Sequence, residues 1–141
     1  MDFRILGPLE ARTDGVPLPP LGPKPRALLA LLLLHANELV PQASLVDGLW
    51  GERPPETAAK ALQVYVSQLR RLLGHERVLT RPGGYQLVVA AGALDLLQFQ
   101  GLVAEARESL PAAAAPKLRE ALGLWRGQAL ADVAEAPFAQ T

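Results

Sequence analysis

The sequence TAAKALQVYVSQLRRLLGHERVLTRPGGYQLV, residues 57–88, combines a helix that has two different faces with a tight hairpin. At roughly 100° per residue, the helix carries a narrow apolar stripe formed by Leu62, Val66, Leu69 and Leu73. Its opposite side carries small, polar and basic side chains, namely Lys60, Val64, Ser67, Gln68 and Arg71. Such a helix can be anchored by one face while the other face meets a ligand.

The basic charge of the chain is concentrated in this stretch. The whole chain has 14 basic and 14 acidic residues and no net charge, which argues weakly against nucleic acid as a partner. Residues 60–82, however, hold a local balance of +4, because Glu76 is set against Lys60, Arg70, Arg71, Arg77 and Arg81. Local potential governs phosphate contact more than total charge does. The helix therefore suits the major groove of DNA.

Composition indicates a folded protein that lies outside membranes. Half of the 141 residues are hydrophobic, which is enough for a real core. The chain has no cysteine and its first residues do not resemble a signal peptide, which fits a cytoplasmic location. The most apolar run, Ala27–Leu34, is far shorter than the roughly 20 residues that span a bilayer. We expect no membrane association.

The first ninety residues predict a small sheet, three helices and a second hairpin. Alternating apolar residues and an Asp14-Gly15 turn predict antiparallel strands over the first twenty residues. Five prolines between Pro17 and Pro25 predict a rigid connector. Helices are expected over 26–36, which is apolar nearly all round and therefore buried, over 42–50, and from residue 57 to Gly74. Residues 78–81 and 85–88 are expected as strands joined by Pro82-Gly83-Gly84.

The remaining residues predict helices only. Gly92 marks the expected boundary between a domain at 1–91 and a second domain at 92–141. Apolar residues at helical spacing run from Leu96 to Leu110, and Pro116 is expected to open the next helix. Trp125 is expected to anchor a core. Two helices with a short break are typical of the start of a helical-repeat domain, so we expect the natural chain to continue.

Strands, three helices and a basic hairpin, in this order, predict a winged helix. The third helix would enter the major groove, and Arg81 in the hairpin would lie along the backbone or minor groove. Gln68 is suited to read adenine, and Lys60 or Arg71 to read guanine or hold phosphate. Arg70 lies nearer the helix edge and is assigned to phosphate or to an ion pair. The alternative reading is an amphipathic helix whose charged face is merely solvated.

Other candidate contacts lie outside the third helix. Lys24 and Arg26 oppose the dipole of the helix that they begin, which hints at phosphate contact. Trp50 is either a core anchor or a backbone contact at the edge of the following loop. No paired acids, metal-ligand cluster, nucleophile–base pair or phosphate-binding loop is recognisable. We therefore expect no enzyme and no cofactor.

Several motifs in combination resemble one family of bacterial regulators. These are Leu6-Gly7-Pro8-Leu9, then residues 22–29 (GPKPRALL), 45–55 (LVDGLWGERPP), 62–71 (LQVYVSQLRR) and 120–127 (EALGLWRG), with Leu94-Asp95, Phe99 and residues 129–132 (ALAD). Together they resemble the Streptomyces antibiotic regulatory protein family, over essentially the whole chain.

The resemblance implies an α+β protein: an OmpR-type winged helix-turn-helix followed by an all-α, tetratricopeptide-like bacterial transcriptional activation domain. It implies an activator of secondary-metabolite gene clusters that binds direct repeats near promoters as a homodimer on DNA and recruits RNA polymerase holoenzyme. By position, the residues that match groove-facing positions are Lys60, Ala61, Val64, Tyr65 and Gln68. Those that match backbone-contacting positions are Ser67, Arg70, Arg71, Trp50 and the wing residue Arg81. Gln68 departs from the arginine that is common there, so the operator is not transferable from relatives.

The sequence thus predicts a DNA-binding transcriptional activator, and two rivals remain open. In one, the winged helix is a scaffold and the C-terminal helices bind a partner. In the other, the same DNA contacts serve a repressor or a signal-receiving regulator. The loop from Gly51 to Pro55 and the hairpin are the candidate contacts for polymerase.

Overall fold

The computed structural model describes residues 1–133 and 136–140, and its contacts form two compact units. The winged-helix unit comprises Leu18–Val89 with the described residues from Val133 onward. The helical-hairpin unit comprises Met1–Pro17 and Ala90–Asp132. The α+β fold class is confirmed. The expected domains, 1–91 and 92–141, are each continuous along the chain, and these boundaries remain a prediction. The contact-based units differ from them, because the first strands group with the later helices.

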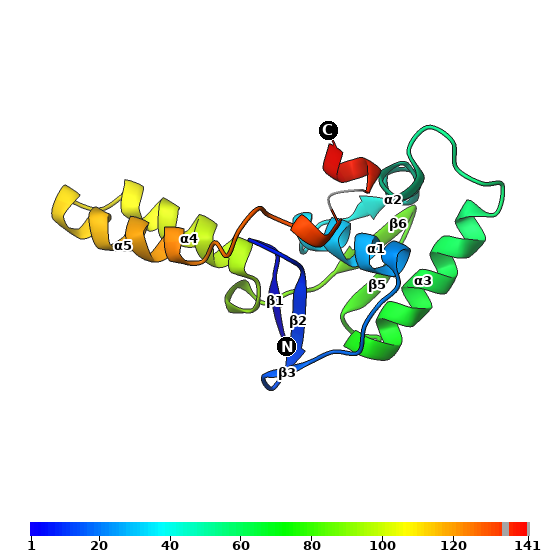
Figure 1. Cartoon of the computed structure of the whole chain (residues 1–141), viewed down its shortest axis with the longest axis horizontal. Coiled ribbons are helices and arrows are strands. Elements are labelled where there is room, and N and C mark those ends of the chain that lie inside the picture. The colour runs from blue at the N-terminus through cyan, green and yellow to red at the C-terminus, as the bar shows by residue number, and fades with distance from the viewer. Residues whose placement is uncertain (134–135, 141) are drawn as a thin grey trace. The chain divides into compact units, whose positions relative to one another are not determined.

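The winged-helix unit contains three helices and a three-stranded sheet (Figure 1). Its helices are α1 (Pro23–Leu34), α2 (Gln42–Trp50) and α3 (Ala58–Leu73), and a short 3-10 turn, η3 (Pro137–Gln140), follows later in the chain. The strands β4 (Val40–Pro41), β5 (Val78–Arg81) and β6 (Gly84–Leu87) pair antiparallel in the order β4-β6-β5. The second and third helices agree with the sequence prediction. Helix α1 begins three residues before its predicted start, with Pro23 at its first position, and ends two residues before its predicted end.

Two glycines allow neighbouring elements of this unit to pack closely. Helix α1 is buried from Ala27 to Leu33, as its uniform apolarity predicts. Gly48 lets α2 lie against it, since a Cβ at Gly48 would stand 2.6 Å from the Leu31 Cδ2. Gly84 has the same role in the sheet, because a Cβ there would overlap the carbonyl oxygen of Val40. Both glycines therefore set the position of α2 and of the hairpin.

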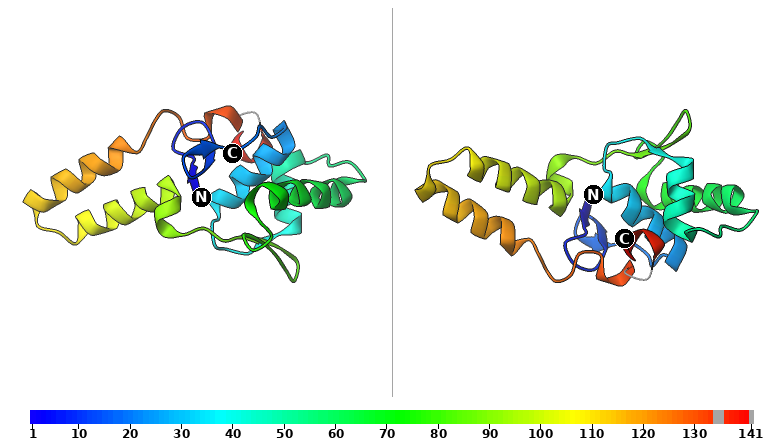
Figure 2. Two further views of the ribbon diagram at one scale, coloured as in Figure 1. Left: turned by 90° about the horizontal axis from the view of Figure 1, so that it is seen from below. Right: turned by 90° about the horizontal axis from the view of Figure 1, so that it is seen from above.

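The helical-hairpin unit begins with a second small antiparallel sheet. Its strands β1 (Asp2–Arg4), β2 (Glu10–Thr13) and β3 (Val16–Pro17) pair in sequence order, which confirms the prediction for the first twenty residues. Asp14 and Gly15 have φ angles of 52° and 80°, as the predicted tight turn requires. After η1 (Ala91–Ala93), helices α4 (Asp95–Arg107) and α5 (Pro111–Gly123) run side by side in the views of Figure 2. A last 3-10 turn, η2, covers Ala131–Val133.

Two expectations for this unit are wrong. Helix α5 begins at Pro111, and Pro116 lies inside it and does not open it. Pro111 occupies the first helical turn, where a missing N–H costs nothing, and the alanines that follow it favour helix. Trp125 is no core anchor: it is 41% exposed and meets Phe99 edge-on, with ring centroids 5.6 Å apart.

Two charged side chains attach the first strands to the helices. The buried Asp95 carboxylate accepts hydrogen bonds from the backbone N–H groups of Ile5 and Leu6, at 2.8 and 2.9 Å. Arg126 donates to the Glu10 carboxylate at 2.8 Å and to the Pro8 carbonyl at 2.7 Å. Residues about 90 and 120 positions apart are thus held in one unit. The sequence reasoning did not single out either contact.

Candidate DNA interface

The predicted two-faced helix is confirmed in α3. Its apolar stripe is buried, with exposed fractions between 0 and 4% for Leu62, Val66, Leu69 and Leu73. The opposite face is exposed and carries Lys60, Val64, Ser67 and Arg71. Val64 is 53% exposed, although an exposed apolar side chain gains nothing from water. Its methyl groups are available for apolar contact with a thymine methyl.

Three further candidate positions flank this face. Ala61, Tyr65 and Gln68 are half-buried, so each presents only part of its side chain. Gln68 retains an amide on the flank of α3, which is the chemistry that adenine recognition needs. The assignment of individual base contacts remains a prediction for all three residues.

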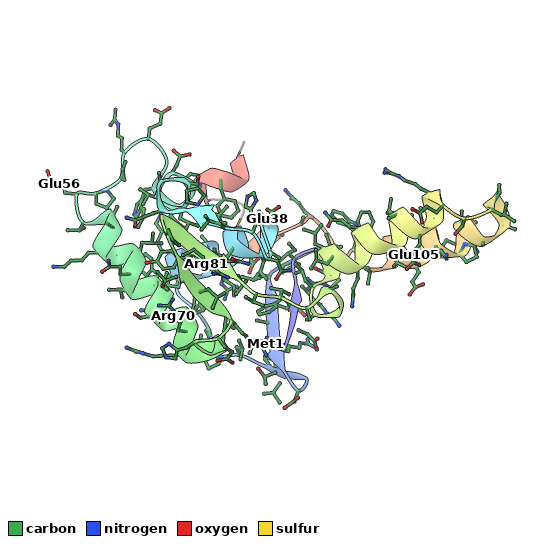
Figure 3. All side chains as sticks on the ribbon, turned by 180° about the vertical axis from the view of Figure 1, so that it is seen from behind. Met1, Glu38, Glu56, Arg70, Arg81 and Glu105 are labelled. Atoms are coloured by element: carbon green, nitrogen blue, oxygen red, sulfur yellow. The ribbon has the colours of Figure 1, made fainter. Side chains whose placement is uncertain are left out.

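Arg70 connects α3 to the hairpin. Its Nε donates to the Val78 carbonyl oxygen at 3.0 Å, and its Nη2 donates to the Thr80 hydroxyl at 2.6 Å. Arg70 and Arg81 are labelled in Figure 3, the first on α3 and the second on the hairpin. Because two of its nitrogens are engaged within the protein, Arg70 serves to fix the hairpin against the helix more directly than to hold phosphate.

The hairpin of β5 and β6 is the predicted wing. Gly83 at its tip has a φ of 85°, a conformation that favours glycine. Arg81 is exposed beside the tip, and its Nε donates to the Gln86 side-chain oxygen at 3.2 Å. The Gln86 amide in turn donates to the backbone oxygen of Asn37 at 2.9 Å. The wing thus presents the Arg81 guanidinium, which Gln86 of the neighbouring strand β6 holds in place by a hydrogen bond.

Asn37 and Gln86 are positioning residues that the sequence reasoning missed. Asn37 has a φ of 67°, and its side chain exchanges two hydrogen bonds with the backbone of Val89. An asparagine just after a helix is a known signal for such a left-handed position, so this role was detectable. Gln86 gave no comparable signal, because its function depends on strand pairing.

The remaining candidates lie near the ends of α1 and α2. Lys24 donates to the carbonyl oxygen of Leu49, and its Nζ lies 5.5 Å from the centroid of the Trp50 ring. Trp50 is half-buried and stacks on Tyr65, with centroids 6.2 Å apart. Arg26 is half-buried in the first turn of α1. The structure therefore brings Lys24 and Trp50 together and directs the lysine inward.

Other kinds of site find no support in the part of the chain that is described. Over residues 1–133 and 136–140, no cluster of three histidine, aspartate or glutamate side chains is arranged to hold a metal ion. Within the same residues, no helix has the length and apolarity needed to cross a bilayer.

Two family models match the chain. The model described as "Transcriptional regulatory protein, C terminal" matches residues 18–87, and the "Bacterial transcriptional activator domain" model matches residues 94–141. The first match coincides closely with the continuous part of the winged-helix unit. The first three strands lie outside both matched ranges.

Several curated relatives match almost the whole chain. The regulatory protein AfsR of Streptomyces coelicolor is 42% identical over 99% of this chain, which spans 14% of that protein. The regulatory protein DnrI of Streptomyces peucetius is 37% identical over 94% of this chain, which spans 54% of that protein. This chain therefore corresponds to only part of the length of these relatives.

A solved structure has the same fold. Mycobacterium tuberculosis EmbR, determined in complex with a low-affinity phosphopeptide, matches with a TM-score of 0.89 and 34% identity. The match covers 99% of this chain and 39% of that one. With its OmpR-type winged helix and bacterial transcriptional activator domain, the chain belongs to the Streptomyces antibiotic regulatory protein family.

Proposed function

We propose that this chain is a sequence-specific DNA-binding transcriptional activator, or the part of one that binds DNA. The observation that carries the proposal is the outer face of α3, where Lys60, Ser67 and Arg71 are exposed while the opposite face is buried. Arg70 fixes the basic wing beside that helix. In this arrangement phosphate contacts supply most of the affinity, and the third helix supplies the specificity.

The finer parts of the proposal come from the relatives. Membership in the Streptomyces antibiotic regulatory protein family supports a role in controlling a secondary-metabolite gene cluster. We propose that two copies occupy a direct repeat near a promoter and that RNA polymerase holoenzyme is recruited there. The candidate polymerase contacts are the exposed loop that follows α2, from Gly51 to Pro55, and the wing. The proposal places this activity in the cytoplasm and includes no catalytic step.

The first experiment is selection of bound duplexes from a randomised pool, with sequencing of the enriched fragments. The chain of 141 residues is incubated with the pool at about 50 mM and about 200 mM salt, a range over which phosphate contacts weaken strongly. Enrichment of a spaced direct repeat is the expected result. Failure to bind any duplex at either salt concentration contradicts the proposal and favours a protein-interaction scaffold.

A second measurement separates an activator from a repressor. Transcription from a promoter that carries the selected repeat is measured in vitro with purified RNA polymerase holoenzyme. We expect added protein to raise the transcript level. The control protein carries Lys60→Ala, Arg71→Ala and Arg81→Ala together, which removes exposed charge while leaving the buried stripe intact. A lower transcript level with the unaltered protein would indicate a repressor.

A further inference from the structure

Lys24 lies where the start of α1 meets the end of α2. Its Nζ donates a hydrogen bond to the carbonyl oxygen of Leu49, one residue before the end of α2. Carbonyl groups in the last turn have no partner within their own helix, and the macrodipole favours a cation there. Lys24 is half-buried by these surroundings. Its charge therefore completes the end of a neighbouring helix.

This contact accounts for a conflict in the sequence. A cation in the first turn of a helix opposes the macrodipole, and α1 has no acidic residue in its first turn to offset it. From the sequence alone, a DNA phosphate is the indicated partner of Lys24. In the structure, Lys24 has a partner within the same unit. Its positive charge is unfavourable at the start of α1 but favourable at the end of α2.

A series of contacts leads from Lys24 to the recognition helix α3. The ammonium lies 5.5 Å from the centre of the Trp50 ring, within the range of a cation–π interaction. Trp50 stacks on Tyr65 at an interplanar angle of 27°. Tyr65 belongs to α3 and is adjacent in sequence to the exposed Val64. Three helices thus meet through one lysine and two aromatic rings.

We propose that Lys24 is a positioning residue for DNA recognition: it holds Trp50 against Tyr65 and thereby fixes α3, and it does not contact phosphate. The inference rests on the proposed DNA-binding function. The two roles differ in a measurable way. Loss of a phosphate contact shallows the salt dependence of binding, because fewer counterions are released. Loss of a positioning contact weakens binding and leaves the salt dependence unchanged.

The contact itself is tested without DNA, in the full chain of 141 residues. The chain has two tryptophans, and a Trp50→Phe variant identifies which indole N–H signal in the ¹⁵N–¹H spectrum belongs to Trp50. Lys24→Met keeps the aliphatic stem and removes the charge, so we expect it to shift the Trp50 signal. Trp125, which packs on Phe99, serves as the internal reference. Lys24→Arg is expected to restore the signal towards its original position. An unmoved Trp50 signal in a folded Lys24→Met protein overturns the proposal.

The role in recognition is tested by titrating a selected duplex at several salt concentrations. Lys24→Met should weaken binding about threefold to tenfold, as expected for loss of a cation–π contact, with an unchanged salt slope. Lys60→Met is the matched control, because it makes the same chemical change on the exposed face of α3. It should shallow the slope by about 0.9. A Lys24→Met slope as shallow as that of Lys60→Met overturns the proposal.

The two tests separate failure of this inference from failure of the proposed function. A wild-type chain that binds no duplex overturns the DNA role of Lys24 together with the proposed function. In that case a shifted Trp50 signal in Lys24→Met still supports the contact between Lys24 and Trp50. Wild-type binding combined with Lys24→Met affinity equal to wild type overturns the positioning role alone.

Discussion

Arg81 and Gln68 represent two different kinds of contribution at the scale of single residues. Arg81 is an exposed cation beside the tip of the wing, and the side-chain oxygen of Gln86 orients its guanidinium. Gln68 is half-buried on the flank of α3 and carries no charge. A charge is attracted to any DNA backbone, whereas an amide discriminates between base edges. Substitutions at the two positions should therefore differ in how the effect depends on sequence and salt.

We predict that Arg81→Ala weakens binding to all duplexes by a similar factor. Removal of one phosphate contact should shallow the slope of log affinity against log salt by about 0.9. The measurement is titration of a selected and a random duplex at several salt concentrations. Unchanged affinity and slope would show that the wing assignment of Arg81 is wrong.

Gln68→Ala should mainly relax the preference for one base pair. A good bidentate contact discriminates by about 1–3 kcal/mol, so affinity for the best duplex should fall while affinity for duplexes altered at that one position changes little. Repeating the duplex selection with the variant measures this directly. Ser67→Ala, which removes a predicted backbone contact from the same helix, is the control: it should lower affinity without altering the sequence preference. An unaltered sequence preference would remove Gln68 from the set of base-reading residues.

At the scale of elements, the wing depends on a side chain from another element. Arg70 links α3 to both Val78 and Thr80 of β5, so the helix and the hairpin present their DNA-facing groups in one fixed arrangement. A hydrogen bond that involves a charged group contributes about 1.5–3 kcal/mol to stability. Loss of this link is expected to reduce the ratio of specific to nonspecific DNA affinity, because the helix and the wing must contact a specific site together.

For Arg70 we predict that substitution by Met weakens specific binding more than nonspecific binding. Without this link the wing can move relative to α3. The helix and the wing then no longer contact the specific duplex in one fixed arrangement, so the specific complex loses more affinity. Titration of a selected and a random duplex gives the ratio of the two affinities. Thr80→Val removes only the hydroxyl partner and should give a smaller effect in the same direction. A uniform loss on both duplexes with a shallower salt slope would restore the phosphate assignment of Arg70.

The spacing of apolar residues predicted most helices and strands, but it could not predict contacts between residues that are distant in the sequence. The stripe of Leu62, Val66 and Leu69 follows from helical spacing alone, and the proline and glycine residues that flank α2 and α3 indicate their limits. Charge is visible in a sequence while its partner is not, so the sequence indicates phosphate for Lys24 and either phosphate or an ion pair for Arg70, and it gives neither of the contacts that the structure shows. Pro116 was misplaced for a related reason: proline suits the first turn of a helix, and only the structure shows that the earlier Pro111 takes that position.

Asp95 gives a prediction for the helical-hairpin unit. Its buried carboxylate accepts two backbone hydrogen bonds, so Asp95→Asn replaces one acceptor with a donor that faces an N–H group. We expect the free energy of unfolding to fall by about 2–4 kcal/mol, measured by urea denaturation. Asp47→Asn, on the exposed side of α2, should change it by less than about 0.5 kcal/mol. Equal stability of the two variants would contradict the structural role of Asp95.

At the scale of the whole molecule, the absence of a net charge is compatible with DNA binding, because the charged residues are unevenly distributed along the chain. Residues 1–90 contain ten basic and eight acidic residues, and residues 91–141 contain four basic and six acidic ones. The positive excess belongs to the half that contains α3 and the wing. Long-range attraction to DNA is therefore weak, and binding should depend on close contacts and on the occupation of repeated sites.

We predict that two copies bind a direct repeat only when both repeats lie on the same side of the duplex. Insertion of about 5 bp between the repeats turns one half-site to the opposite side and should abolish joint occupancy, whereas insertion of about 10 bp should largely retain it. Sedimentation of the protein–DNA complexes counts the bound copies. Equal occupancy with both spacers would indicate that the copies bind independently.

The grouping of the first strands with late helices also sets an order of events during synthesis. Residues 18–89 form the continuous part of one unit, so this part is complete on the ribosome while Met1–Pro17 still lack α4 and α5. At 5–20 residues per second, the first strands wait on the order of several seconds for Asp95 and Arg126 to emerge. The beginning of the chain is therefore among the last parts to fold. During that interval the apolar side chains of Phe3 and Ile5, which end up buried, are open to chaperones and to neighbouring nascent chains.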